Sequence, residues 1–281
     1  MRRFRSDEIL LWVATAVVFA PAVLALADRW ASTEYYQHGF LVPLVSLATA
    51  HPRLRRLGPG GRHPAALAAL AGALALYAMG VLLAGVTAQG LALVAAITAL
   101  VGYRWGAAGL RRLAFPLAFL LFMVPLPEAW VFPVIVTLQE WASVGAVAVL
   151  HLFDVAVARD GNVIRLANGD ALFVAEACSG ITSLISLIPI GVLLARFTQD
   201  DFAKRCWLVA AVIPAALICN AVRVIATVAA ADAFGTQQAT SGPIHESAGM
   251  LTSAFAVVLV IGFGAWMRRM SADAPPTPAS A

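Results

Sequence analysis

Charge is the scarcest property of this chain. Asp, Glu, Lys and Arg make up 12% of its 281 residues, about half the share found in a typical soluble domain, whereas 61% of the residues are hydrophobic. This imbalance excludes an ordinary soluble globular protein and indicates a membrane protein. The net charge of only +4 gives no reason to expect a nucleic-acid partner.

Cysteine is also scarce. The three cysteines, at positions 178, 206 and 219, have no paired spacing, which excludes a disulfide framework and a zinc site; we expect no metal and no other cofactor. Cys206 and Cys219 fall in one apolar run, where a thiol behaves as a small hydrophobe. Cys178 instead precedes Ser179 and Gly180 at the expected start of a helix, whose dipole favours a thiolate nucleophile. A buried structural thiol is the alternative.

Long apolar runs recur along the chain, and a helix needs about 20 such residues to cross a bilayer. They predict an all-α polytopic membrane protein with about eight transmembrane helices. The expected spans are 8–27, 38–50, 65–84, 86–103, 113–126, 178–196, 206–231 and 247–267. The second and fifth of these are short enough to be re-entrant. A further, punctuated stretch at 131–153 predicts a helix that lies at the membrane interface or packs on the bundle.

The basic residues predict the topology, because Lys and Arg concentrate in short cytoplasmic loops. They occur before the first span and after the second, fourth, sixth and eighth spans. Both termini are therefore expected in the cytoplasm, and the other loops outside. The N-terminal run has features of a signal peptide, but we favour a retained span. Aromatic residues near the span ends, Trp30 and Tyr36 among them, are expected to lie in the membrane interface.

The longest external loop contains two turn signals between short apolar runs, Asp160-Gly161 and Asn168-Gly169. They predict a small extracytoplasmic β-meander directly before Cys178, with a plain loop as the alternative. Its strands are expected at about 155–159, 162–167 and 170–175. The sequence thus predicts four regions: N-terminal helices over 1–126, an interfacial helix and meander over 127–177, catalytic helices over 178–267, and a disordered cytoplasmic tail over 268–281.

Several polar residues stand near the expected external membrane face. Arg223 falls inside the seventh span, where an arginine costs about 2.5–3.5 kcal/mol, so we expect it to reach a polar cavity rather than to snorkel to the surface. Asn220 shares its helix face. His245 precedes the eighth span, and His38 opens the second on the same side. Glu176, close to the cysteine, either opposes thiolate formation or orients the His or the Arg.

Together, a Cys, an Arg and a His supply a nucleophile, a cation that stabilises an oxyanion, and a proton carrier. Five sequence blocks, in this order, also resemble the signature of the exosortase/archaeosortase family of integral-membrane cysteine transpeptidases. They are YYQHGFLVP at 35–43, FMVPLP at 122–127, EACSGITSL at 176–184, NAVRV at 220–224 and HESAG at 245–249. The resemblance implies that the catalytic residues are Cys178, Arg223 and His245.

The other members of the candidate site stand in supporting positions: Glu176, Ser179, Gly180, Asn220 and His38. Thr182 departs from the larger polar residue that many relatives of the family carry there, which leaves the subgroup and its exact signal open.

The resemblance further implies substrates and location. The substrates are exported proteins with a C-terminal PEP-CTERM type signal, made of a Pro-Glu-Pro motif, a transmembrane helix and a basic tail. The family is thought to cleave near the motif through a thioester and to transfer the new C-terminus to a surface acceptor, often alongside exopolysaccharide production. We therefore expect a multi-pass protein in contact with the lipid of a bacterial inner membrane, with its active site on the periplasmic side.

Two other functions are alternatives. A transporter or channel would use Arg223 and His245 in a polar pathway without a nucleophile, although such pathways usually place polar residues across the whole membrane. An intramembrane metalloprotease is less favoured, because HESAG has Gly249 where a His-Glu-x-x-His motif requires its second histidine.

Overall fold

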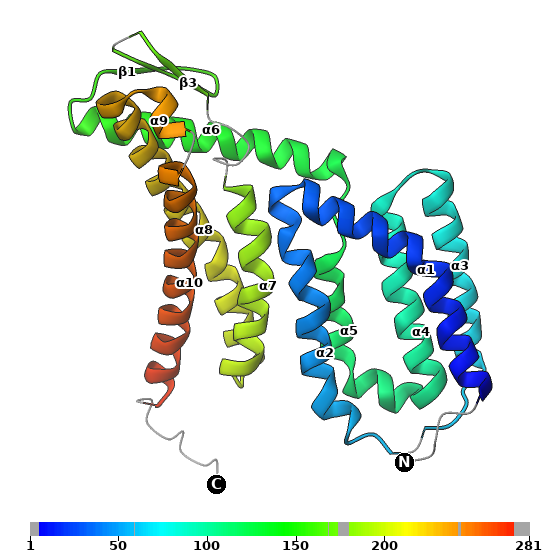
Figure 1. Ribbon diagram of the computed structural model, residues 1–281. Helices are drawn as coiled ribbons and strands as arrows, with labels where there is room; N and C mark the ends of the chain where they lie inside the picture. Colours follow the sequence, from blue (N-terminus) through cyan, green and yellow to red (C-terminus); the bar gives the residue numbers. More distant parts are fainter. Residues whose placement is uncertain (1–5, 59, 168, 174–179, 241–242, 273–281) are drawn as a thin grey trace. The chain divides into compact units, whose positions relative to one another are not determined.

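The computed structural model describes residues 6–58, 60–167, 169–173, 180–240 and 243–272. Within these ranges the chain is predominantly helical, and its β structure is one small three-stranded sheet. The predicted all-α polytopic architecture with a short meander is confirmed. The chain divides into two compact units, residues 1–128 and 129–281, and each is described by itself (Figure 1). The finer division into four regions stays a prediction.

The first unit is a group of helices joined by short turns and by one longer loop between α2 and α3. Its elements are α1 (Ser6–Ser32), η1 (Glu34–Phe40), α2 (Leu41–Leu54), α3 (Ala65–Leu82), α4 (Val86–Arg112), α5 (Ala114–Phe119) and η2 (Leu120–Met123). Helices α1, α3 and α4 share a core rich in small side chains: Phe19, Ala22, Leu70, Ala73, Ala92, Ala96, Ala99 and Leu100. Small residues let helix backbones approach closely, which favours helix association in lipid.

One end of this unit gathers basic segments that are far apart in the sequence. Arg62, in the loop before α3, pairs with Asp7 at the start of α1. Arg104 of α4 lies with its Nε 3.8 Å from a carboxylate oxygen of Glu8, and both side chains are buried. The start of α1, the α2–α3 loop and the last part of α4 therefore lie together, as the alternation of basic loops predicts.

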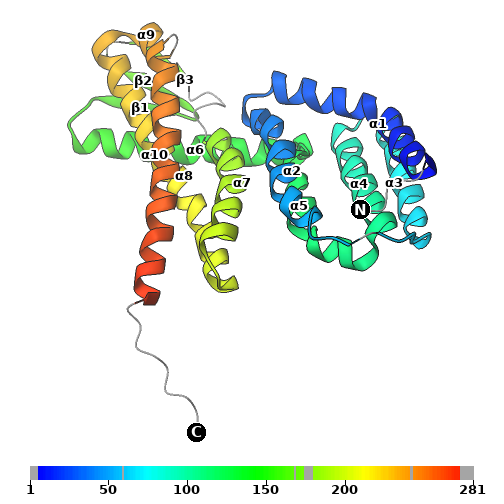
Figure 2. The ribbon, with the colours of Figure 1, turned by 60° about the horizontal axis from the view of Figure 1, so that its bottom comes forward.

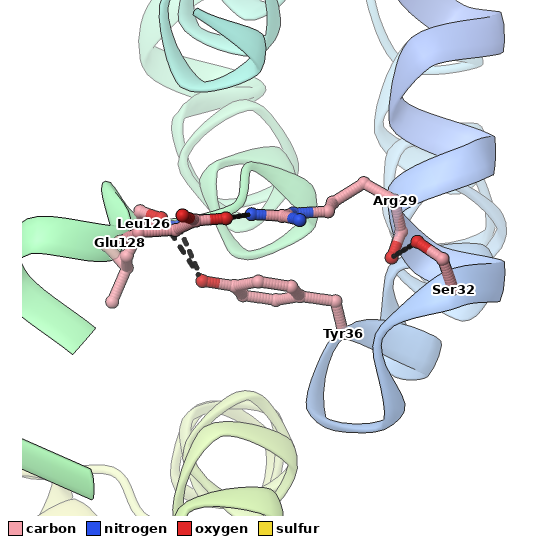
Figure 3. A network of polar contacts seen from close by, with 5 residues as sticks. All are labelled: Arg29, Ser32, Tyr36, Leu126 and Glu128. Atoms are coloured by element: carbon pink, nitrogen blue, oxygen red, sulfur yellow. Dashed lines mark hydrogen bonds and ion pairs between the residues drawn. The ribbon is translucent and has the colours of Figure 1, made fainter. Parts of the chain in front are cut away.

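The other end of α1 is joined to the segment that follows η2 (Figure 3). The Tyr36 hydroxyl donates to the Leu126 carbonyl at 3.2 Å and accepts a hydrogen bond from the Leu126 N–H at 3.0 Å. Beside them, Arg29 of α1 forms an ion pair with Glu128. One phenol thus satisfies both main-chain groups of a residue that stands between two helices.

Trp30 and Tyr36 are buried against protein, with 6% and 4% of their surface exposed, and their depth in the membrane stays a prediction. Trp30 Nε1 donates to the Met123 carbonyl at 2.8 Å. The chain becomes extended at Val124, so the main-chain groups there lack helical partners. The polar tips of buried Trp and Tyr side chains supply those partners.

The second unit contains the sheet and the long C-terminal helices (Figure 2). Its elements are α6 (Glu128–Leu152), β1 (Val157–Asp160), β2 (Val163–Leu166), β3 (Ala171–Phe173), α7 (Ile181–Thr198), α8 (Phe202–Phe234), α9 (Thr236–Thr240) and α10 (Pro243–Ala272). The strands form an antiparallel meander in the order β1-β2-β3, so the predicted meander is confirmed and the plain-loop alternative is wrong.

The sheet is packed against helices of its own unit. Strand residues Val157, Ile164, Leu166 and Leu172 share one buried core with residues of α6 and α8. Three short strands are not stable alone, so this core supplies the apolar contacts that they need. Helix α6 runs steeply across the direction of α7, α8 and α10, which is the packed position predicted for 131–153 (Figures 1 and 2). Its depth relative to a membrane stays a prediction.

Among the described residues, seven helices are long and apolar enough to cross a membrane. Six of them, α1, α3, α4, α7, α8 and α10, stand at predicted spans, and the seventh is α6. The two runs that the sequence marks as short form α2, which has 14 residues, and the stretch from α5 to η2. Both are shorter than the usual length of a crossing helix.

Helix ends differ from the prediction at three places. Helix α7 begins at Ile181 rather than at 178, because Gly180 takes the N-cap position with a left-handed φ of 88°. Helix α10 begins at Pro243 rather than at 247, and proline suits a first helical position because its missing N–H is not needed there. The same helix continues to Ala272, which corrects the tail predicted from 268; basic residues in a last turn are favoured by the helix dipole. Residues 273–281 lie outside the described ranges.

Replacing Tyr36 by Phe is expected to destabilise the first unit, because the change removes the shared partner of the Leu126 N–H and carbonyl. Unpaired buried polar groups cost about 1–3 kcal/mol. The apparent unfolding temperature of the detergent-purified protein should therefore fall by several degrees. The matched control is Tyr77→Phe, since the Tyr77 ring packs on Phe19 and its hydroxyl has no hydrogen bond among the described residues. An equal fall in both variants would contradict the assignment.

Candidate active site

Arg223 is buried on α8, with 9% of its surface exposed. Its guanidinium packs against α10 at Gly249, where an added methyl group would lie 3.2 Å from Arg223 Cζ and Nη2. Such a contact is tighter than ordinary van der Waals packing, so glycine is the residue that leaves the guanidinium its room. The burial disfavours a reach to the membrane surface, and the predicted polar cavity stays a prediction.

Asn220 lies one turn before Arg223 and is also buried, with 5% of its surface exposed. It contacts the start of α7, because a methyl group added at Gly180 would lie 3.0 Å from the Asn220 Cγ. The Gly180 carbonyl accepts a hydrogen bond from the Leu184 N–H at 3.0 Å, which fixes Gly180 as the first residue bonded to the helix. Its left-handed φ and its close neighbour both favour glycine here, two residues after Cys178.

Asn220, Arg223 and Thr227 form a buried polar stripe along α8, since positions i, i+3 and i+7 share a helix face. We name these three residues the α8 stripe. Thr227 Oγ1 donates to the Arg223 carbonyl at 2.9 Å, so this hydroxyl is satisfied within the helix. Helix α7 meets the stripe at Gly180, and helix α10 meets it at Gly249.

These contacts join the three sequence blocks that carry the predicted catalytic residues. Gly180 belongs to the cysteine block and Gly249 to the histidine block, and both touch the helix that carries Arg223. His245 lies in the first turn of α10, about one helical turn before Gly249. The helix starts of α7 and α10 are thus held on one face of α8.

The cysteine block is described only from Gly180 onward. Cys178, Glu176 and Ser179 lie outside the described residues, so their roles stay predictions. Thr182 has a buried hydroxyl with no hydrogen-bond partner among the described residues. A buried hydroxyl of this kind is open to a bound ligand or to water.

The other two cysteines behave differently from each other. Cys219 is 2% exposed and belongs to the apolar core shared by α7, α8 and α10, which confirms its predicted role as a small hydrophobe. Cys206 is exposed near the start of α8.

His38 lies in the first unit, where its Nε2 is 3.0 Å from the Phe122 carbonyl. A carbonyl oxygen only accepts hydrogen bonds, so Nε2 carries the hydrogen. Burial of the ring lowers the pKa of His38 below its ordinary value, because a charged imidazolium loses hydration there. The contact joins the sequence blocks 35–43 and 122–127, and the supporting role of His38 in catalysis stays a prediction.

Two residues at this site were not assigned a role from the sequence. In the sequence, Gly249 served only to argue against a His-Glu-x-x-His metal motif. A small residue in an apolar helix is, however, a usual signal of a close helix contact. The sequence does not distinguish Thr227 from a structural threonine. Single threonines are common in apolar helices, where the hydroxyl bonds to the backbone of its own helix.

The fold and the site define a multi-pass helical membrane protein in which three helices converge on a buried arginine. A family model described as transmembrane exosortase matches residues 30–262, which is most of the chain. The chain therefore belongs to the transmembrane exosortase family, and this membership gives it a general role as a membrane peptidase or transpeptidase. Comparison with curated proteins and with solved structures gave no match.

Replacing Gly180 by Ala is expected to destabilise the protein for two reasons, the positive φ and the contact with Asn220. Gly169 separates them, because its φ of 90° is similar but an added methyl group meets nothing within 4 Å. Gly169→Ala should show the backbone cost alone, about 1–2 kcal/mol. Gly180→Ala should lower the free energy of unfolding by more than Gly169→Ala does. Adding Asn220→Ala to Gly180→Ala should remove part of this difference, because the methyl group then has room. Thermal unfolding in detergent measures the wild type and these three variants; equal losses at Gly169 and Gly180 would refute the contact.

Proposed function

We propose that this exosortase cleaves the C-terminal sorting signal of exported proteins with Cys178 as nucleophile, Arg223 as oxyanion-stabilising group and His245 as proton carrier. The observation that carries the proposal is the double contact of the α8 stripe, with Gly180 on one side and Gly249 on the other. The two glycines stand two residues after Cys178 and four after His245. These contacts support the proposal that a thiol, a guanidinium and an imidazole act in one region.

In the proposed reaction, the Cys178 thiolate attacks the carbonyl carbon of the scissile peptide bond and forms a tetrahedral oxyanion. Arg223 stabilises the negative oxygen, and its burial strengthens this attraction, because the surrounding dielectric is low. The carbon–nitrogen bond then breaks while protonated His245 gives its proton to the departing amine. A thioester of Cys178 and the new C-terminus remains.

The second half of the reaction transfers the acyl group. A nucleophile from the acceptor, or water, attacks the thioester carbonyl while His245 takes its proton. The carbon–sulfur bond breaks and Cys178 leaves as thiolate. A site that excludes water lets the thioester persist until an acceptor arrives, which favours transfer over hydrolysis.

The proposed substrates carry a PEP-CTERM type signal, and the proposed location is a bacterial inner membrane with the site on the periplasmic side. The basic loops support this orientation, since those of the first unit gather at one end and cytoplasmic loops concentrate Lys and Arg. The surface acceptor and the link to exopolysaccharide production belong to the same proposal, on the family resemblance alone.

Replacing Cys178 by Ala is expected to abolish processing of a co-expressed tagged substrate while the protein still inserts into the membrane. The matched control is Cys206→Ala, which removes an exposed thiol and should process at the normal rate. Immunoblotting of precursor and product measures both. Undiminished processing without Cys178 would overturn the proposal. Solute flux in proteoliposomes that needs Arg223 but ignores Cys178 would favour a transporter instead.

Replacing Gly249 by Ala is expected to slow processing by roughly tenfold, because the methyl group displaces the Arg223 guanidinium, and small misplacements of catalytic groups are costly. The control is Gly262→Ala on the same helix, where an added methyl group meets nothing within 4 Å. Rates from a processing time course should separate the two variants. Equal rates would show that Arg223 needs no defined position.

A further inference from the structure

A cavity of about 430 Å³ in the first unit is lined by three arginines, Arg53, Arg56 and Arg112. They come from the last turn of α2, from the turn that follows it and from the last residue of α4. The reaction proposed above uses none of them. Positive charges that converge on one cavity repel one another, so their arrangement calls for an explanation.

Main-chain contacts hold two of these side chains in place. Arg53 Nη1 donates to the Thr49 carbonyl, and its guanidinium carbon lies 5.9 Å from the centre of the Phe115 ring. Arg112 Nη1 donates to the Arg56 carbonyl, which ties the end of α4 to the turn after α2. A guanidinium has five N–H donors, so one main-chain bond leaves most of them for another acceptor.

These three arginines differ from other arginines at the same end of the unit in their charge pairing. Arg62 pairs with Asp7, and Arg104 lies beside Glu8. Within the residues that the structure describes, no carboxylate forms an ion pair with Arg53, Arg56 or Arg112. The cavity therefore presents an uncompensated positive field, which an anion of suitable size would neutralise.

Basic residues tend to gather in cytoplasmic loops, which explains why this end of the unit has many arginines. It does not explain why three of them line one cavity. Arg55 and Arg111 are the immediate sequence neighbours of Arg56 and Arg112, are exposed in the same way, and do not line the cavity. The chain thus directs only some of its basic side chains to this place.

We propose that this cavity binds the phosphate of an anionic phospholipid headgroup. The planar fork of a guanidinium matches two phosphate oxygens at once. Arginines at the ends of membrane helices lie at headgroup depth, and basic pockets between such helices take acidic lipids. The volume lies within the range of small-molecule sites, about 300–1,000 Å³. A bound headgroup would connect α2 to the end of α4 and so stabilise the first unit.

The test compares two charge-matched double variants of the full-length protein, purified in a neutral detergent. Arg56→Gln with Arg112→Gln removes two cavity arginines, and Arg55→Gln with Arg111→Gln removes two neighbours outside it. Native mass spectrometry counts phosphatidylglycerol retained from mixed micelles, with phosphatidylcholine as the uncharged comparison. The wild type and the neighbour variant should retain phosphatidylglycerol alike, and the cavity variant should retain at least tenfold less.

Thermal unfolding adds a second readout. Phosphatidylglycerol should raise the unfolding temperature of the wild type and of the neighbour variant, but not that of the cavity variant, and millimolar inorganic phosphate should not reproduce the rise. Equal lipid retention in the two double variants would overturn the proposal, because general charge would then suffice. An equal rise with inorganic phosphate would overturn the lipid as ligand and indicate a site for soluble phosphate. Neither outcome depends on the cysteine chemistry.

Discussion

The burial of one guanidinium inside the helix bundle constrains the arrangement of the C-terminal helices. An arginine at the centre of a membrane helix costs about 2.5–3.5 kcal/mol unless protein surrounds it. Here α10 reaches Arg223 with a glycine, Gly249, and the start of α7 reaches the neighbouring Asn220 with another glycine, Gly180. Close helix approach and burial of the charge are therefore the same structural feature. It keeps a polar stripe on α8 next to the segments that carry Cys178 and His245.

The two units stabilise their irregular segments in different ways, one by hydrogen bonds and one by apolar packing. In the first unit, Trp30, Tyr36 and His38 bond to main-chain groups between Phe122 and Leu126, where the chain leaves helical geometry. In the second unit, the meander shares its core with α6 and α8. Non-helical backbone in a membrane protein needs hydrogen-bond partners from protein or water, which these side chains provide in the first unit and strand pairing provides in the meander. The sequence blocks 35–43 and 122–127 thus have a structural role in the first unit.

Much of the fold could be predicted from the sequence, because span length, basic loops and Asp-Gly and Asn-Gly turns are local signals. The six long spans and the three strands follow from them. The burial of Trp30 could not be predicted, since an aromatic residue near a span end has the same local pattern whether it faces the interface or a carbonyl ninety-three positions away. The contact of Gly249 with Arg223 could not be predicted either, because a single glycine in an apolar helix is a weak signal and the contact depends on a side chain of another helix. Helix ends also shifted, because Gly180 and Pro243 act through backbone geometry that periodicity does not reveal.

We propose that Cys178, two residues before the contact of Gly180 with the α8 stripe, acts as the nucleophile. The decisive experiment quenches the enzyme with acid while it processes a peptide that carries the C-terminal sorting signal. The enzyme is then digested and analysed by mass spectrometry. We expect the peptide containing Cys178 to carry the added mass of the substrate's N-terminal fragment, as a thioester that hydroxylamine cleaves. An adduct on another residue, or turnover with no covalent adduct at Cys178, would contradict it.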